Sequence, residues 1–267
     1  MFIPENILIT VGHSILKNGS CTSAGGYVQE YAYCKMLAPI LKKYLLLGGA
    51  KRVDVVVCPE RQFIKWQQER DYKLPIANSG KYDAVIELHL NCFNGSAKGT
   101  ECLYMSARGK ELAQRVNDQL DDVYTDRGIK YNDGLYILAK TKPVAMLIEG
   151  FFCDNKEDYE KSDEPHEVER MARLIAQGIL NKSIVDKPVA PSKPNSYPNG
   201  DYDRKARVVK TGDGFLSVRE GRGTGFSEIG RYNEGQVITV NYCKDNWFST
   251  YDLGKKGFVS GTCIELI

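Results

Sequence analysis

The amino-acid sequence predicts an α/β domain, with a twisted and mostly parallel sheet flanked by helices, followed by a small all-β barrel. Over residues 1–184, short apolar stretches rich in β-branched residues alternate with helix-like stretches, which is the pattern of βαβ units. The apolar stretches are nearly continuous, and such strands suit a sheet that is covered on both faces. From residue 204 onward, glycine-rich turns separate short strands, as in small barrels.

The individual elements of the first domain follow from these patterns. A helix is expected over about residues 28–47, because apolar side chains recur at helical spacing and Gly48 with Gly49 supplies a C-terminal cap. Pro39 must start, kink or break this helix. Strands are expected at residues 7–11, 52–58, 84–90, 100–105 and 144–150, and further helices at about residues 60–72, 107–124 and 165–181.

The composition changes after residue 184. Residues 185–203 contain four prolines and few apolar residues, which is typical of an extended linker. We therefore expect a first domain over residues 1–184, a linker over 185–203, and a second domain over 204–267. The second domain has expected strands at residues 207–209, 215–219, 236–242, 246–251 and 257–260.

Charge and hydropathy exclude several classes of protein. The chain has 36 Lys and Arg against 34 Asp and Glu, a net charge of +2, so neither nucleic acid nor an anionic membrane is an expected partner. No apolar run reaches the roughly 20 residues of a membrane-spanning helix, so we expect no membrane insertion. The N-terminal MFIPENILITVGH lacks a basic head, so we expect no signal peptide.

The eight cysteines include no CxxC pair and several lie in apolar strands, which indicates free thiols in a reducing compartment.

Two of the three histidines lie at the ends of expected strands. His13 follows the first strand, and His89 ends the third. Functional groups collect at the carboxyl ends of strands in open α/β sheets, so these two imidazoles can converge on a metal. His166 lies at the start of a helix within an acidic stretch, and we expect it on the surface.

Three glutamates complete the candidate site. Catalytic zinc commonly takes three protein ligands and leaves a position for water. Glu30 opens the helix after the first strand, where it is either a third ligand or a favourable charge at the helix N-terminus. Glu149 ends an apolar strand, where a carboxylate next to a metal is a natural general base. Glu87 lies two residues before His89 on the same strand face, where it either orients a ligand or reaches solvent.

Four separated segments lie within about residues 6–181: TVGHS, VQEYAY, ANSGKYDAVIELHLNCFNG and KPVAMLIEGFFCDNKED. Together they resemble zinc-dependent N-acetylmuramoyl-L-alanine amidases of phage endolysins and bacterial autolysins. The resemblance implies that His13, Glu30 and His89 bind Zn²⁺, that Glu149 is catalytic, and that peptidoglycan is the substrate. The segment CDNKEDY is most similar to endolysins of phages that infect clostridia. Two departures stand out: Glu87 replaces a serine that many members carry, and Cys153 with Asp154 replaces smaller residues.

Residues 204–267 contain the segments FLSVREGRGTGFSEIGRYNEGQVITV and NWFSTYDLGKKGFVSGTCIEL. Through these segments, residues 204–267 resemble a bacterial SH3-like (SH3b) cell-wall-binding domain. We expect core positions for Trp247, Phe258, Leu216 and Val218. Three tyrosines either stack on a wall component or pack in the core or at its rim: Tyr232, Tyr242 and Tyr251.

Together the resemblances imply an endolysin that stays in the host cytoplasm until it is released onto the cell wall. A prophage-encoded bacterial autolysin is an alternative origin, and nothing in the sequence indicates an oligomeric state. Three other functions compete: a zinc carboxypeptidase that trims stem peptides, a wall-binding protein without activity, and a thiol enzyme that uses Cys92 or Cys153. A carboxypeptidase usually has its first His and Glu three residues apart, whereas His13 and Glu30 are seventeen apart.

Overall fold

The computed structural model divides the chain into two compact units, Met1–Ile184 and Val185–Ile267. It describes residues 1–184, 196–209, 211–212 and 214–267. Residues 185–195 of the expected linker therefore lie outside the described residues.

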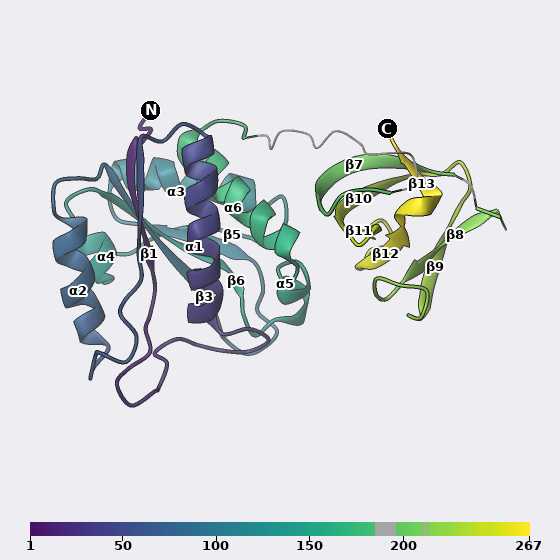
Figure 1. Cartoon of the computed structure of the whole chain (residues 1–267). Helices are drawn as coiled ribbons and strands as arrows, with labels where there is room; N and C mark the ends of the chain where they lie inside the picture. Colours follow the sequence, from purple (N-terminus) through teal and green to yellow (C-terminus); the bar gives the residue numbers. More distant parts are fainter. Residues whose placement is uncertain (185–195, 210, 213) are drawn as a thin grey trace. The chain divides into compact units, whose positions relative to one another are not determined.

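The first unit is built on a six-stranded sheet in the order β2-β1-β3-β6-β4-β5. Figure 1 shows this sheet with the helices of the unit around it. All neighbouring strands are parallel except β4 and β6, which are antiparallel. This arrangement confirms the expected α/β fold with a mostly parallel sheet. The strands are β1 (Asn6–Val11), β2 (Arg52–Val56), β3 (Ala84–Asn91), β4 (Thr100–Tyr104), β5 (Asp126–Tyr131) and β6 (Val144–Phe152).

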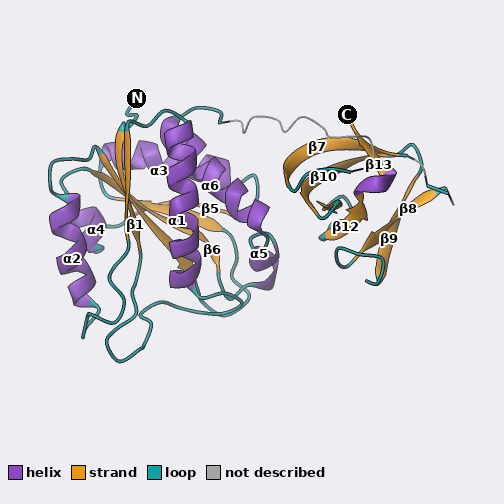
Figure 2. Ribbon diagram, viewed as in Figure 1, coloured by secondary structure: helices purple, strands orange, loops and turns teal. Residues whose placement is uncertain are grey.

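Helices cover both faces of this sheet (Figure 2). Along β1, Ile7, Ile9 and Val11 pack into one apolar cluster while Leu8 packs into the other. A strand with both faces buried needs apolar residues without alternation, which explains the continuous apolar strands of the sequence. The larger cluster lies beneath α1 (Glu30–Leu47), α3 (Ala107–Leu120) and α6 (Pro165–Leu180), and the smaller one involves α2 (Gln67–Ala77) and α4 (Tyr136–Ala139).

Several elements differ from the expectations. Helix α1 runs on through Pro39, because Leu37, Ala38 and Leu41 are buried on both sides of it. Helix α2 (Gln67–Ala77) was expected over about residues 60–72, so it begins seven residues later and ends five residues later than expected. Strand β5 was missed because its sequence, DRGIKY, is polar and lies at the edge of the sheet. Helix α4 and helix α5 (Lys156–Glu160) are too short to give a helical period.

The expected surface position of His166 is wrong. Its side chain is only 1 % exposed, and the adjacent Glu167 and Val168 are buried as well. A capping box between Glu164 and Glu167 fixes the start of α6. The first turn of the helix therefore packs into the domain although its sequence is acidic.

The second unit is an antiparallel seven-stranded sheet in the order β13-β7-β10-β11-β12-β8-β9. Its strands are β7 (Gly200–Val208), β8 (Phe215–Arg219), β9 (Glu228–Asn233), β10 (Val237–Lys244), β11 (Trp247–Thr250), β12 (Gly257–Ser260) and β13 (Ile264–Leu266). β7 begins inside the range assigned to the linker, and the sequence did not indicate β9 or β13. Trp247 is half-buried rather than in the core, because strand alternation turns Phe248 inward instead. Tyr232 is a core residue.

Among the described residues, helices that combine the length and apolarity of a membrane span are absent. All eight cysteines are free thiols.

Candidate metal centre and active site

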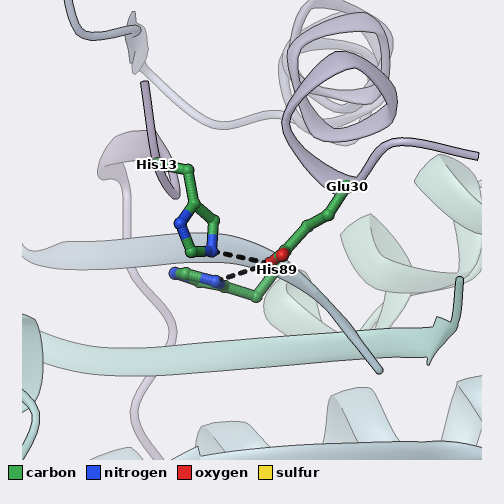
Figure 3. A group of neighbouring side chains, drawn as sticks. All are labelled: His13, Glu30 and His89. Carbon is green, nitrogen blue, oxygen red and sulfur yellow. Dashed lines mark hydrogen bonds and ion pairs between the residues drawn. The ribbon is translucent and has the colours of Figure 1, made fainter. Parts of the chain in front are cut away.

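Three elements of the first unit bring two histidines and a glutamate together. His13 follows β1, His89 lies near the end of β3, and Glu30 is the first residue of α1. Figure 3 shows both imidazole rings turned toward the Glu30 carboxylate. Glu30 Oε1 lies 3.1 Å from His13 Nε2 and 2.8 Å from His89 Nδ1. The donor atoms of the three residues lie within 4.8 Å of one another.

The backbone around His13 is adapted to this convergence. His13 has a positive φ of 66°, a left-handed conformation that a non-glycine residue adopts only at a cost. Before it, a Cβ atom on Gly12 would overlap the imidazole ring of His89. The absence of a side chain on Gly12 therefore makes room for the imidazole of His89.

Glu30 is held as a carboxylate. Its Oε1 accepts a hydrogen bond from the backbone N–H of Leu90, and its Oε2 accepts one from Ala24. Burial alone raises the pKa of Glu30, but hydrogen bonds and charge from His13 and His89 outweigh it and lower the pKa to about 2.

Glu87 is buried, which decides between its two sequence-based interpretations. It is 2 % exposed, and its Oε1 lies 3.2 Å from His89 Nε2. It contacts a ligand candidate and does not reach solvent. Burial lowers the pKa of His89, but hydrogen bonds to Glu30 and Glu87 raise it to about 10. In the metal-free site this imidazole therefore carries a proton that a metal would displace.

Glu149 lies on β6 directly beside His89 in the strand register. Its side chain is half-buried, and its Oε2 is buried with no hydrogen-bond partner among the described residues. Burial raises the pKa of Glu149 to about 7. A carboxyl group that takes up and releases a proton near neutral pH suits general acid–base catalysis.

An open cleft with a volume of about 680 Å³ is lined by His13, Glu87, His89 and Glu149. Helix α2 and its flank supply Trp66, Glu69 and Arg70 to one wall, and the α4 region supplies Leu135 and Tyr136. Glu69 and Lys73 on α2, both buried, were not among the predicted site residues. Two opposite charges four residues apart on a helix normally indicate a solvent-facing pair, so no local pattern indicated their burial.

The donor set fits a catalytic divalent metal. Two imidazole nitrogens and one carboxylate oxygen form a common ligand set for catalytic zinc. Glu87 accepts from the second nitrogen of His89, as carboxylates do around metal-bound histidines. Glu149, whose Oε2 has no hydrogen-bond partner among the described residues, lines the same cleft. Within this fold, the two imidazoles and the carboxylate form a candidate site for a catalytic divalent metal.

Comparison with known proteins identifies the family. Residues 7–181 match the family model described as N-acetylmuramoyl-L-alanine amidase. The match spans more than half of the chain, which therefore belongs to this family.

Individual relatives agree with this assignment. The catalytic domain of the CD27L endolysin, which targets Clostridium difficile, is 53 % identical, with a TM-score of 0.66 over 68 % of this chain and 99 % of that domain. An amidase structure from Clostridium difficile 630 shares the fold at 24 % identity, with a TM-score of 0.55 over 66 % of this chain and 95 % of that one. An uncharacterized cell wall amidase of Bacillus anthracis is 34 % identical over 121 residues, which is 41 % of this chain but only 23 % of that protein.

Proposed function

We propose that this protein is a zinc-dependent phage endolysin that lyses a Gram-positive, and specifically clostridial, host. Its reaction is hydrolysis of the amide bond between N-acetylmuramic acid and L-alanine. The observation that carries the proposal is the convergence of His13, Glu30 and His89 beside Glu149 in a chain of the amidase family.

In this proposal His13, Glu30 and His89 hold the metal, and Glu149 is the catalytic residue. Zinc, when bound, supplies Lewis-acid chemistry: it polarises a carbonyl group and makes a water molecule more acidic. Glu149 accepts the proton of the attacking water and passes it to the nitrogen of the departing L-alanine. The raised pKa of Glu149, about 7, supports both steps at neutral pH.

Mass spectrometry of digested cell walls tests the reaction. We expect new N-terminal alanine on stem peptides, with intact glycan strands and no trimming of the stem peptide. Shortened stem peptides would instead favour a carboxypeptidase. Intact walls would favour a binding protein without activity, and activity that resists chelators but is blocked by thiol reagents would favour a cysteine enzyme.

We propose that residues 204–267 belong to an SH3-like wall-binding domain that holds the enzyme near its substrate. A tethered binding domain raises the local concentration of the catalytic domain at the wall. The antiparallel sheet of the second unit supports this proposal.

The clostridial host and the release from its cytoplasm are supported by the 53 % identity to an endolysin catalytic domain that targets such a bacterium. Zymography on walls of several Gram-positive species, with and without chelator, tests the host range. We expect metal-dependent clearing that is strongest on clostridial walls. Equal clearing on all walls would contradict the host assignment.

A further inference from the structure

Helix α2 carries two charged side chains that are buried close to the metal centre. Lys73 is fully buried, and Glu69 is 6 % exposed. The two residues are four apart, so they lie on the same face of the helix. Buried charges are costly unless they are paired. The hydrogen-bond partners of these two residues in turn contact the two histidines.

Lys73 reaches His89 through Glu87. The Lys73 ammonium donates to Glu87 Oε2 (3.1 Å), and the Thr10 hydroxyl donates to the same oxygen (2.9 Å). Glu87 Oε1 is left for His89 Nε2 at 3.2 Å. Because a carboxylate only accepts hydrogen bonds, the Nε2 nitrogen must carry a proton. The nitrogen that remains for a metal is Nδ1, which faces Glu30.

Glu69 reaches His13 through Thr22. The hydroxyl groups of Thr22 and Ser14 both donate to Glu69 Oε1 at 2.8 Å. The Thr22 oxygen is then left to accept hydrogen bonds, and His13 Nδ1 lies 3.4 Å from it. This contact places a proton on Nδ1 of His13. The nitrogen that remains for a metal is Nε2, which faces Glu30.

We propose that Glu69 and Lys73 are positioning residues through which a single helix fixes the tautomer and ring orientation of both histidine ligands. His13 then binds the metal through Nε2, whereas His89 binds it through Nδ1. This inference rests on the proposed function, in which both histidines are zinc ligands. Loss of such an outer partner commonly lowers metal affinity by roughly 10–100-fold.

Nitrogen NMR of the full chain, labelled with ¹⁵N in histidine, tests the assignment directly. The chain has only three histidines, so each imidazole nitrogen can be followed. On addition of Zn²⁺ we expect a mixed pattern, with a protonated Nδ1 on His13 and a protonated Nε2 on His89. The buried His166 lies outside the cleft lining, so its resonances are an internal reference.

Two variants test the two hydrogen-bond chains separately. Thr22→Val interrupts the chain from Glu69 to His13, and Lys73→Met removes the ammonium group that pairs with Glu87 in the chain to His89. In each we expect zinc affinity, measured by competition with a chelator, to fall by roughly 10–100-fold. The tautomer signature of the affected histidine should also weaken, while the other histidine keeps its pattern.

A matched control separates positioning from general destabilisation. Leu120→Ala removes a fully buried side chain on α3, outside the cleft lining. It should lower stability yet leave zinc affinity and the imidazole resonances unchanged. If Lys73→Met fails to fold, the double variant Lys73→Met/Glu87→Gln removes both charges of the pair and provides the same comparison.

The outcomes separate this inference from the proposed function. If the wild-type chain shows the mixed pattern but Thr22→Val and Lys73→Met bind zinc as tightly as Leu120→Ala does, the positioning role is overturned and the zinc chemistry stands. If both histidines of the wild type bind through the same nitrogen, the tautomer assignment is overturned. If Zn²⁺ does not change the imidazole ¹⁵N resonances of His13 and His89, both this inference and the proposed function are overturned.

Discussion

Replacement of Glu149 by glutamine should abolish activity and at the same time stabilise the metal-free protein. The neutral amide has nearly the same shape, but it cannot take a proton from water. If Glu149 is the general base, the rate of wall hydrolysis should fall by about 100-fold or more. Zinc binding should persist, because Glu149 is not one of the three clustered donors.

The stabilising effect follows from the raised pKa of Glu149. Burial raises this pKa from 4.5 to about 7. Below pH 4.5 the carboxyl is protonated in both the folded and the unfolded chain, so its ionisation has no effect on stability. Between pH 4.5 and 7 the unfolded chain releases this proton while the folded chain keeps it. Stability is therefore lost as pH rises, by up to about 3 kcal/mol at 1.36 kcal/mol per pKa unit.

Urea unfolding of the chelator-treated wild type and Glu149→Gln proteins, from pH 4.5 to 8, measures this difference. The two free energies of unfolding should diverge with rising pH and reach a constant gap above about pH 7. A gap that does not change with pH would refute the idea that this carboxyl is forced to ionise in a buried site. Full hydrolytic activity of zinc-loaded Glu149→Gln would refute its catalytic role independently.

Four other predictions concern the metal and the second unit. His13→Ala and His89→Ala should each lose zinc together with activity, and stoichiometric zinc by metal analysis of either variant would contradict the ligand assignment. Chelation should stop wall clearing, and added Zn²⁺ should restore it; clearing that persists in the chelated, metal-depleted protein would contradict a metal enzyme. A fragment of residues 196–267 should bind purified walls without cutting them, and recovery of this fragment in the supernatant would contradict wall binding. A fragment that starts at residue 204 should be less stable by about 3–5 kcal/mol, because it lacks the buried Tyr197, which packs on Phe248 and donates to the carbonyl of Ile264. Equal melting temperatures of the two fragments would contradict this difference.

The main features of the fold were predictable because they depend on local pattern. Strands buried on both faces need continuous apolar residues, and β1, β3 and β6 have them. The polar edge strand β5 has no such requirement, so its sequence did not indicate a strand. His166 was misplaced for a related reason: an acidic helix start resembles a solvated one until the packing of its first turn is known.

The features of the site likewise fall into those that the local sequence predicts and those that only the tertiary structure shows. By itself, the sequence determined the candidate residues, because a histidine at a strand end or a glutamate closing an apolar strand is conspicuous in its local context. Tertiary structure alone decided that His89 lies beside Glu149 in the strand register, and that Lys73 and Glu69 lie buried behind the two histidines. Burial of a charged helix residue depends on which face of the helix packs on the sheet. That face is set by contacts between segments far apart in the chain, and local sequence pattern does not encode them.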